Sequence, residues 1–309
     1  MTHYINQDTA LPLLLACLAL VIAIVELAAY LPKVTRVSRA VKSQDDEPMP
    51  ASGYPKVSIV IYCHNDSDGL AALLPSLLSQ DYPEEFEIIV VNDGRDYLTE
   101  ALVNSHEGEA VRVYHTFTPR DTRNLSRKKL ALTLGIKAAS HDAIVHVTSS
   151  TRVVSPRWLR LMAHPLADSA TDVVIGYASV VEAGGNRSRS RDDDRLIDSV
   201  HYLSSAICGS AYRGDGDNLA YSKSLFFRMK GFNNSINLHY GDDDIFVADA
   251  STAENTAVVI AREAQVETVN NNPADDYMYS KLRHAFTAKF AGTRQHLFYG
   301  VGSMLLWCW

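Results

Sequence analysis

The chain has 309 residues, of which 47% are hydrophobic and 21% charged, and its formal net charge is −7. This composition excludes a largely disordered chain, because it supplies enough apolar surface for a buried core. The negative net charge argues against a nucleic-acid-binding protein, since phosphate contacts need a basic face, although a local basic pocket for one diphosphate is compatible with it.

The cysteines indicate the redox compartment. They are widely spaced along the chain and form no Cys-x-x-Cys pair or Cys/His cluster, so we expect neither a zinc site nor a disulfide framework. A reducing, cytoplasmic environment fits this pattern. The four positions are Cys17, Cys63, Cys208 and Cys308.

The first element is an apolar segment at residues 10–31, which is long enough to cross a bilayer and carries a single charge, Glu26. A cleaved signal peptide is the alternative, but residues 1–9 lack the basic start of signal peptides. Basic residues follow the segment instead and should stay on the cytoplasmic side: Lys33, Arg36, Arg39 and Lys42. We therefore predict a transmembrane helix in an inner or plasma membrane, with the rest of the chain in the cytoplasm.

Residues 32–56 are expected to form a juxtamembrane linker, because 43–56 is acidic and rich in proline and small residues. After it, short β-branched runs alternate with helical patterns, which predicts an α/β fold with a mainly parallel sheet flanked by helices. Ligands of such sheets bind beyond the carboxyl ends of the strands. The expected strands are 57–62, 87–91, 143–147 and 172–176, and the expected helices are 68–80, 97–106 and 124–139.

Polar residues follow the first two predicted strands. The first strand leads into His64, Asn65 and Asp66, and the second ends at Asp93 within Asn-Asp-Gly. Each group alone is ordinary turn chemistry. On consecutive strands of one sheet, together they favour a site for a nucleotide base and ribose.

Three stretches resemble the donor-binding half of the family 2 glycosyltransferases: VSIVIYCHND at 57–66, LLPSLLSQDYPEEFEIIVVNDG at 73–94 and KKLALTLGIKAASHDAIVHV at 128–147. The resemblance covers roughly residues 57–290, through 155–159, 212–232, 241–249 and 280–284. It implies an inverting enzyme of the GT-A fold and is greatest to membrane-anchored bacterial members. It also implies one domain at 57–295, with a nucleotide-sugar-binding half at 57–160 and an acceptor and catalytic half at 161–295.

The resemblance assigns donor-binding roles. Asp93 matches the acid that contacts the nucleotide, and the loop 64–66 matches the lining of the base. Lys128 and Lys129 begin the helix where the family has a basic contact near the donor. Lysines at a helix start oppose the helix dipole, which a nearby anion would explain, although an exposed helix end is the alternative.

The acceptor side centres on Asp242, Asp243 and Asp244. The resemblance assigns Asp243 as the base that deprotonates the acceptor hydroxyl, and repulsion among adjacent carboxylates should raise at least one pKa. A helix N-cap is the alternative reading, since the acids precede the apolar run IFVA.

Other acceptor-side residues follow from the same resemblance. Arg283 matches a basic element that could hold the departing diphosphate, and His284 stands where the family commonly has tryptophan. The segment GDGDN is expected to form a glycine-rich turn at the acceptor site, with Gly214, Asp217 and Asn218 beside the acceptor.

The family's metal-binding motif, Asp-x-Asp, should follow the strand at 143–147, but the chain reads Thr-Ser-Ser-Thr at 148–151. Ser149 and Thr151 fall where the carboxylates belong. A hydroxyl can bond a phosphate but is a poor ligand for Mg²⁺ or Mn²⁺, so a metal cofactor has little support, with Asp93 as the remaining candidate ligand.

Three interpretations of this departure are open. Cationic side chains (Lys128, Lys129, Arg283 and Arg152) could replace the metal's neutralisation of the diphosphate. Catalysis could instead be lost, which would leave a glycosyltransferase-like binding or partner subunit. Alternatively, Asp215 or Asp217 could supply substitute ligands.

The function expected from the sequence is transfer of a sugar, with inversion, from a nucleotide-diphosphate donor to a saccharide or lipid-linked acceptor. A nucleotidyltransferase is disfavoured, because no glycine-rich phosphate loop followed by lysine is present. Residues 296–309 are apolar and too short to span a membrane. They could begin a truncated membrane helix, lie at the interface, or pack on the core.

Overall fold

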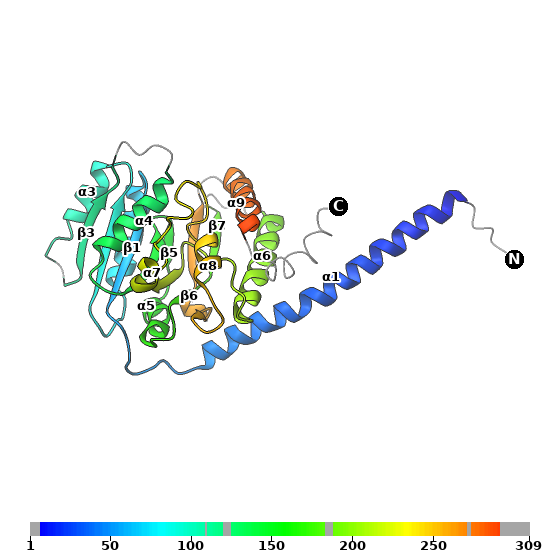
Figure 1. The fold of residues 1–309 in the computed structure, drawn as a ribbon, viewed down its shortest axis with the longest axis horizontal. Coiled ribbons are helices and arrows are strands. Elements are labelled where there is room, and N and C mark those ends of the chain that lie inside the picture. Colours follow the sequence, from blue (N-terminus) through cyan, green and yellow to red (C-terminus); the bar gives the residue numbers. More distant parts are fainter. Residues whose placement is uncertain (1–6, 109, 120–124, 183–187, 271–272, 291–309) are drawn as a thin grey trace.

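The computed structural model describes residues 7–108, 110–119, 125–182, 188–270 and 273–290. An α/β domain carries one long N-terminal helix, α1 (Gln7–Asp46), which extends well beyond the domain (Figure 1). The expectations for 296–309 and for the first six residues lie outside the described residues.

The main sheet has seven strands in the order β3-β2-β1-β4-β8-β6-β9. Strands β1, β2, β3 and β4 are mutually parallel where they pair, as are β6 and β9, while β8 runs antiparallel to β4 and β6. The predicted mixed, mainly parallel sheet is therefore confirmed. The strands are β1 (Val57–Cys63), β2 (Phe86–Asn92), β3 (Arg112–Phe117), β4 (Ala143–Thr148), β6 (Val173–Ile175), β8 (Leu219–Ser222) and β9 (Thr256–Val258).

A smaller sheet of three strands lies beside it, in the order β5 (Thr151–Val153), β10 (Val266–Asn270) and β7 (Ala178–Glu182). Strand β10 is antiparallel to β5 and parallel to β7. In the main sheet, β1 to β4 come from the half predicted at 57–160, and β6, β8 and β9 come from the half predicted at 161–295. The two predicted halves therefore share one sheet. Their division stays a prediction.

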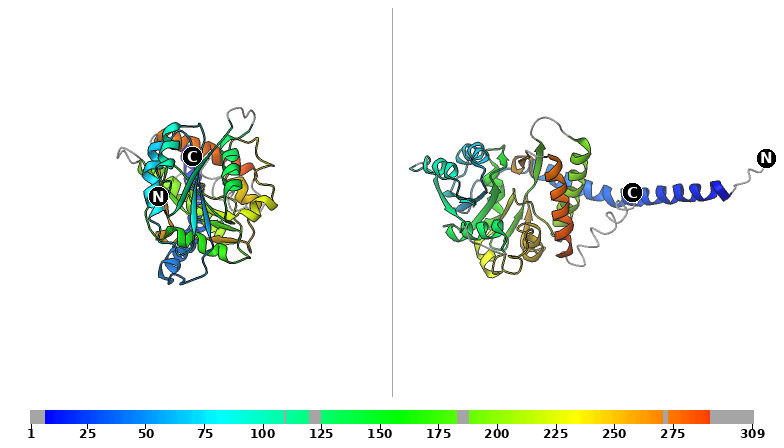
Figure 2. Two further views of the ribbon diagram at one scale, coloured as in Figure 1. Left: turned by 90° about the vertical axis from the view of Figure 1, so that its left-hand side faces the viewer. Right: turned by 90° about the horizontal axis from the view of Figure 1, so that it is seen from above.

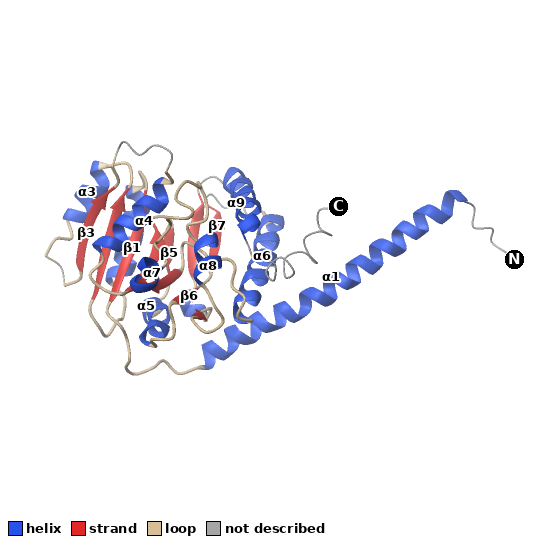
Figure 3. Cartoon of the chain, in the orientation of Figure 1, coloured by secondary structure: helices blue, strands red, loops and turns tan. Residues whose placement is uncertain are grey.

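Helices cover both faces of the main sheet (Figure 3). The three predicted helices are present as α2 (Ser67–Leu78), α3 (Tyr97–Asn104) and α4 (Arg127–Ala138). The second half adds α5 (Trp158–Ala163), α6 (Arg189–Ile207), α7 (Lys223–Arg228), α8 (Asp244–Ala250) and α9 (Pro273–Thr287). Three short 3₁₀ helices are η1 (His164–Ala167), η2 (Arg262–Ala264) and η3 (Ala288–Phe290).

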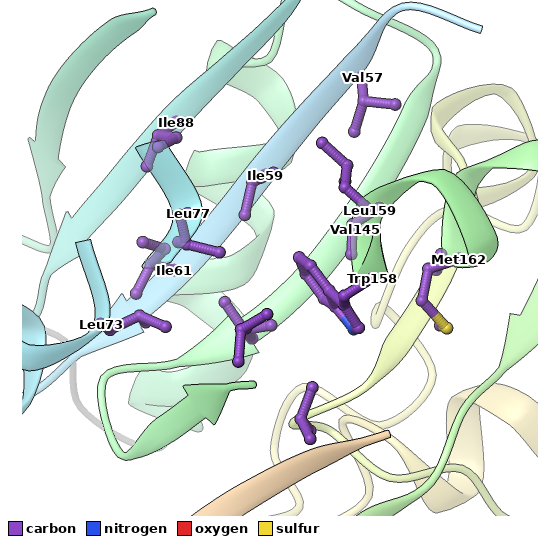
Figure 4. Packing of buried hydrophobic residues seen from close by; sticks show 14 of the residues in the cluster. Val57, Ile59, Ile61, Leu73, Leu77, Ile88, Val145, Trp158, Leu159 and Met162 are labelled. Atoms are coloured by element: carbon purple, nitrogen blue, oxygen red, sulfur yellow. The ribbon is translucent and has the colours of Figure 1, made fainter. Parts of the chain in front are cut away.

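Two apolar layers hold the main sheet between its helices. Side chains alternate across a strand, so Ile59 and Ile61 of β1 face one layer while Val60 faces the other. The first layer packs against α2 and α5, where Trp158 is wholly buried (Figure 4). These layers make the sheet rigid, so the loops at its carboxyl edge have a fixed platform.

The linker expected at 32–56 is wrong in its first part, because α1 continues to Asp46. The C-terminal part of α1, from Lys33 to Asp46, is bound to the domain by side chains. The Lys33 ammonium lies 2.9 Å from His201 Nδ1, and Arg36 donates to Ser204 Oγ at 2.6 Å. Further along, the Gln44 carboxamide bonds main-chain groups of 258–261. These contacts keep 32–46 helical, and only 47–56 form the connection.

Within the described residues, α1 is the single helix that is long and apolar enough to cross a membrane. Its leucines between residues 11 and 31 are exposed, with no domain packed over them. Figure 2 shows the same end of α1 standing clear of the domain in a second view.

Candidate active site

The loops after β1, β2 and β4 meet at the carboxyl edge of the main sheet. The strand register pairs Cys63 with Asn92 and Tyr62 with Thr148, so the three strands end side by side. Main-chain bonds continue this alignment into the loops, from Asp93 N–H to the Cys63 carbonyl at 2.7 Å and from Ser149 N–H to the Tyr62 carbonyl at 3.0 Å. The edge predicted to hold a ligand therefore collects the predicted polar residues.

Asp93 is the centre of the first polar cluster and is fully buried, with 0% of its surface exposed. One carboxylate oxygen accepts hydrogen bonds from Thr118 Oγ1 and from the Arg127 guanidinium, the latter at 2.5 Å. The other accepts one from Tyr62 Oη at 2.9 Å and lies 3.3 Å from His64 Nδ1. We call these five residues the Asp93 cluster.

The Asp93 cluster keeps its carboxylate ionised. Burial alone would raise the pKa of Asp93, but the hydrogen bonds from Thr118, Arg127 and Tyr62 outweigh it and hold that pKa below its ordinary value. Because a carboxylate has about four lone-pair directions, three donors and the adjacent His64 ring leave it little capacity to bond a nucleotide as well. The surface that faces a ligand here is formed instead by the more exposed His64 and Arg127.

The loop 64–66 is built around its neighbours. Asn65 has φ +48°, in the left-handed region, and its side-chain oxygen approaches Gly94 so closely that a Cβ there would lie 2.3 Å away. Gly94 itself has φ +128°. Asp66 caps α2 through the Gly69 N–H and accepts a bond from Ser149 Oγ at 2.7 Å. Asp66 is therefore a structural cap whose second oxygen fixes the loop after β4.

Of the two predicted lysines, only Lys128 reaches the site. Its ammonium lies 2.6 Å from Asp242 Oδ2 and joins the donor side to the acceptor side. The assignment of Lys129 to donor binding is wrong, because its side chain is wholly buried and its ammonium donates to the carbonyls of Ser235, Leu238 and Tyr240. Helical geometry explains this result, since adjacent residues point about 100° apart.

The second polar cluster holds three consecutive carboxylates and a cation for each, and we call these six residues the triple-acid cluster. Lys128 pairs with Asp242, Arg283 with Asp243 at 3.2 Å, and Arg213 lies 3.6 Å from Asp244. All three acids are buried. Asp243 also caps α8 by accepting the Asp244 N–H, so the cap predicted as an alternative is present.

The three acids differ in protonation. Burial would raise the pKa of Asp242, but the charges of Lys128 and Arg283 outweigh it and hold that pKa well below the ordinary range. Burial and the negative charge of Asp243 raise the pKa of Asp244 to about 7. Repulsion therefore raises one pKa, as predicted, and the carboxyl affected is Asp244.

Arg283 and His284 lie next to these acids on α9. Burial would lower the pKa of Arg283, but Asp243 and Asp244 outweigh it and raise that pKa further, so the guanidinium stays charged. Burial and the charge of Arg213 hold the pKa of His284 well below its ordinary value. The Arg283 guanidinium lies 3.1 Å from His284 Nε2, so neutral His284 can accept its hydrogen bond.

The segment GDGDN contributes differently from the prediction. Asn218 is fully buried, accepts from Trp158 Nε1 at 3.0 Å and donates to the carbonyls of Tyr177 and Ala264. Gly214 is packed against the side chains of Val247 and Leu219. The amide of Asn218 is therefore used within the protein and Gly214 is closely packed, so the structure gives the acceptor-side assignment of these two residues no support.

Two other residues of this segment, Asp217 and Gly216, lie close to polar side chains. Asp217 accepts hydrogen bonds from Thr148 Oγ1 at 2.6 Å and from Thr268 Oγ1 at 2.5 Å. A Cβ at Gly216 would lie 3.2 Å from Asp243 Oδ2 and 3.5 Å from the Lys128 ammonium. Gly216 therefore lets the backbone pass close to both the base candidate and a cation, with little room for a side chain.

The positions of the Asp-x-Asp motif do not fit a divalent metal. Ser149 Oγ donates to Asp66, and Thr151 Oγ1 accepts the Thr148 N–H. Within the described ranges, no group of three or more His, Cys, Asp or Glu side chains could hold an ion. Asp93 is saturated by its own donors, and both oxygens of Asp217 are bonded by threonines.

A cavity of about 490 Å³ opens on the other side of Arg283 and His284, between α6, α9, β7 and β10. Asp215 and Asp217 also line it, together with tyrosines 177, 202, 277 and 279. Burial and the charge of Asp217 raise the pKa of Asp215 to about 6. A cavity of this size is in the range of small-molecule sites, and its aromatic and polar lining suits a saccharide.

The sequence analysis missed several residues that build these clusters. Arg127 directly precedes the predicted lysines, so the basic start of α4 was the available signal. Tyr62 is the last residue of the strand predicted at 57–62. Arg213, Thr118 and Thr287, whose hydroxyl donates to Asp244 at 2.7 Å, gave no local signal, because they reach the site from separate elements.

Comparison with known proteins gives a family match over most of the domain. Residues 58–250 match the family model described as Glycosyl transferase family 2. An N-acetylglucosaminyltransferase of Mesorhizobium japonicum is 30% identical over 157 residues, which is 50% of this chain and 35% of that protein. A poly-β-1,6-N-acetyl-D-glucosamine synthase of Staphylococcus epidermidis is 32% identical over 95 residues, 31% of this chain and 22% of that protein. The chain thus spans about a third or less of these relatives.

Solved structures of similar fold include two glycosyltransferases. The mannosyltransferase PcManGT of Pyrobaculum calidifontis, in complex with GDP-Man and Mn²⁺, aligns with a TM-score of 0.55 at 15% identity, over 93% of this chain and 86% of that one. S. aureus TarS in complex with UDP-GlcNAc aligns with a TM-score of 0.52 at 18% identity, over 81% of this chain and 71% of that one. At these identities the comparison supports the fold alone.

Proposed function

Since the chain belongs to glycosyl transferase family 2, we propose that it transfers N-acetylglucosamine, with inversion, from UDP-N-acetylglucosamine to a saccharide or lipid-linked acceptor. The proposed donor is supported by the names of the relatives, which are N-acetylglucosaminyltransferases and a poly-N-acetylglucosamine synthase. The TarS structure with bound UDP-GlcNAc has the same fold.

One observation supports the proposed chemistry, namely that Asp243 Oδ2 and the Lys128 ammonium both lie close to the Cβ position of Gly216, at 3.2 Å and 3.5 Å. Glycosyl transfer needs a base for the acceptor hydroxyl and positive charge for the departing diphosphate. Here both lie within a few ångströms of the Gly216 Cβ position, and Arg283 adds a second cation beside Asp243. A single in-line displacement fits this arrangement.

The proposed step runs as follows. Asp243 takes the proton of the acceptor hydroxyl while that oxygen bonds to the anomeric carbon. The bond from the anomeric carbon to the diphosphate oxygen breaks, and its electron pair leaves with the diphosphate through an oxocarbenium-like transition state. Asp244 holds a proton near neutral pH, which reduces the repulsion that Asp243 experiences when ionised.

No step is assigned to a divalent metal, because the residues at 149 and 151 do not fit one. Lys128 and Arg283 are proposed to bind the diphosphate instead, and Arg127 the nucleotide. Each of these cations is already paired with a carboxylate. A bound diphosphate would therefore compete with Asp242 and Asp243 for them, and that exchange would free the Asp243 oxygen that now accepts from Arg283.

We also propose that residues 10–31 anchor the chain in the inner or plasma membrane with the domain in the cytoplasm, where nucleotide sugars are available. The exposed apolar half of α1 supports this topology, as does the basic cluster from Lys33 to Lys42. A reporter fused after residue 56 should behave as cytoplasmic, and export of the reporter would contradict the topology.

The test of the proposed reaction is UDP release from UDP-N-acetylglucosamine by the purified full chain in nanodiscs. The Asp243→Asn variant is the control for background hydrolysis. Release that depends on Asp243 and rises with added chito-oligosaccharide supports the proposal. Donor binding without any Asp243-dependent release would favour the alternative, a partner subunit without activity, which the substitutions at 149 and 151 suggest.

A further inference from the structure

The cavity of about 490 Å³ between α6, α9, β7 and β10 contains buried polar atoms that the described residues leave without a hydrogen bond. Tyr202 of α6 lines the cavity and is 1% exposed, yet its hydroxyl has no partner. His284 Nδ1, on α9, is also unbonded. A buried polar group without a partner is unfavourable. Two such atoms in one cavity therefore indicate a site for a ligand with hydrogen-bonding groups.

The charged side chains of this cavity differ in their partners. Asp215 and Asp217, which we call the acid pair, form no ion pair within the part of the chain that the structure describes. Asp217 accepts from two threonine hydroxyls, and Asp215 Oδ1 accepts the Asp217 N–H at 3.1 Å. The cations that line the cavity each lie close to another carboxylate: Arg195 to Glu182, Arg213 to Asp244, Lys281 to Asp194 and Asp198, and Arg283 to Asp243.

The two carboxylates of the acid pair repel each other. Burial and the charge of Asp217 raise the pKa of Asp215 to about 6, despite the opposing charge of Arg213. At neutral pH Asp215 is therefore mostly ionised, beside a second carboxylate. A bound cation relieves this repulsion, whereas an uncharged ligand leaves it in place.

A hydroxyl group beside the acid pair is also oriented as an acceptor. Thr148 Oγ1 donates its hydrogen to Asp217 at 2.6 Å, so Ser150 is the donor in the 2.9 Å bond between Ser150 Oγ and Thr148 Oγ1. Ser150 lines the cavity and, with its hydrogen used, offers only lone pairs to a ligand. An ammonium group, which has three hydrogens and a positive charge, matches these acceptors and the carboxylate oxygens beside them.

His284 supplies a group of the opposite kind. Burial and the charge of Arg213 hold its pKa well below the ordinary value, so the ring is neutral. Its Nε2 lies 3.1 Å from the Arg283 guanidinium and accepts from it, which leaves the ring hydrogen on Nδ1. Nδ1 can therefore donate to a ligand oxygen, and the Tyr202 hydroxyl can donate or accept. The cavity thus combines acceptors for an amine with partners for the hydroxyls of a sugar.

We propose that this cavity binds an acceptor sugar through a free amine, an inference that rests on the proposed function. The ammonium lies between the acid pair and Ser150 Oγ, and hydroxyls of the sugar bond Tyr202 and His284. Arg283 lines the same cavity and contacts Asp243, so an acceptor held here lies next to the proposed base. An N-acetylated sugar would cover the acid pair with an uncharged group, and burial of carboxylates without a counter-charge is unfavourable.

The first experiment measures binding and does not require activity. The full chain in nanodiscs is titrated by calorimetry with a chito-oligosaccharide, and with the same oligosaccharide after removal of its N-acetyl groups. The form with free amines should bind at least about tenfold more tightly, as expected for hydrogen bonds between charged groups. Equal affinities, or tighter binding of the acetylated form, would overturn the proposal.

A charge variant shows whether the acid pair causes this preference. Asp215→Asn removes one charge, while its amide oxygen can still accept the Asp217 N–H. Affinity for the amine form should fall about tenfold, and affinity for the acetylated form less than about twofold. Asp276→Asn removes the same charge from an exposed position at the cavity and is the matched control. An equal loss in this control would mean that net charge attracts the amine, which overturns the site.

Tyr202→Phe gives a second test that does not depend on the acid pair. The hydroxyl has no partner among the described residues, so its removal should keep or raise the Tm. Both oligosaccharides should bind about threefold more weakly, because each loses one hydrogen bond. A lower Tm with unchanged binding would show that the hydroxyl serves the protein interior, and would contradict its role in the site.

Activity separates this inference from the proposed function. UDP release from UDP-N-acetylglucosamine should have an apparent KM at least about fivefold lower for the amine acceptor than for the acetylated one. Release with the reverse preference would overturn the free-amine proposal and leave glycosyl transfer in place. A calorimetric preference for the amine, without UDP release in the presence of either acceptor, would support the ligand of the cavity and contradict the proposed reaction.

Discussion

The Asp93 cluster and the triple-acid cluster lie at the same edge of one sheet, but they shift carboxyl pKa values in opposite directions. Asp93 accepts hydrogen bonds from three donors and lies beside His64, and its pKa is held below the ordinary value. In the triple-acid cluster three acids share three cations, and the pKa of Asp244 is raised to about 7. The first cluster therefore holds a permanent anion, while the second holds a proton that can move.

This difference indicates that aspartate has different roles in the two clusters. A carboxylate that is saturated by donors organises the groups around it and is a poor base. A carboxylate beside another carboxylate exchanges its proton in the pH range where enzymes work. Each of the following predictions tests that contrast.

The largest effect is expected from Asp243→Asn, which should lower transfer about 10²–10⁴-fold, the usual contribution of a general base. Nucleotide affinity should change less than about threefold, because the asparagine oxygen can still cap α8. Transfer assays and nucleotide titrations measure the two quantities. Asp249→Asn, on the exposed face of the same helix, is the control. A matching loss of affinity would remove the distinction between the two clusters.

Asp93→Ala should have the reverse pattern, with nucleotide affinity lowered at least about tenfold and transfer at saturating donor affected less. The reason is that Arg127, Tyr62 and His64 lose their common acceptor, and a buried donor left unpaired costs about 1–3 kcal/mol. Calorimetric titration with UDP measures the change. Asp68→Ala, an exposed acid of α2, is the control.

A double-mutant cycle sharpens this second prediction. If Asp93 acts by holding Arg127, Arg127→Ala should cost little more once Asp93 is absent. Additive losses in the double variant would mean that the two residues contact the nucleotide independently.

Removal of metal should have a modest effect on donor binding. UDP affinity in excess chelator is expected to be within about fivefold of that in saturating Mn²⁺, because Ser149 and Thr151 are bonded to protein groups and offer no carboxylate. The variant with Ser149→Asp and Thr151→Asp should gain metal-dependent transfer if the rest of the site is intact. A hundredfold loss on chelation of the parent chain would reveal a metal site that the described residues do not show.

The smallest effect is expected on stability. The pKa of Asp244 lies near 7 in the folded chain against an ordinary 3.8, so the folded chain keeps a proton that the unfolded chain releases. This group's contribution to stability therefore falls as pH rises from about 4 to 7. Asp244→Asn, which resembles the protonated form, should raise the Tm by about 2–4 °C at pH 8. The gain should shrink steadily as the pH falls toward 4, and an equal gain at pH 4 and pH 8 would point to a cause other than ionisation.

The fold was largely predictable, and the parts that were missed share a physical reason. Strands β1, β2 and β4 are continuous buried β-branched runs, which periodicity detects directly. Strand β3 is a partly exposed edge strand, and β8 has four residues, so neither gives such a run. The linker was misjudged because side-chain contacts with α6 and η2 extend α1, and such contacts leave no local pattern.

Site residues could be predicted where a polar side chain directly follows a strand. They could not be predicted where tertiary packing determines the direction of the side chain. Asp93, Lys128 and Asp242 were found in the clusters expected for them. Lys129 carries the same charge as Lys128, but it points into the domain, and the sequence gives no sign of which lysine faces the ligand. Asn218 looked like a polar loop residue, while its amide is fully used by three groups from distant elements.

Because α1 is a single helix from Gln7 to Asp46, it determines how the domain is rotated about the helix axis and how far the domain lies from the apolar half of α1. The helix continues from its exposed apolar half into the contacts with His201, Ser204 and η2. The number of residues between these two parts therefore determines the rotation of the domain about the helix axis. One inserted residue near position 32 would turn the domain about 100° around the helix axis and move it about 1.5 Å along that axis. Seven inserted residues would nearly restore the angle at about 10 Å greater distance. The number of residues in α1 therefore determines both the orientation of the domain about the helix axis and its distance from the apolar half of the helix.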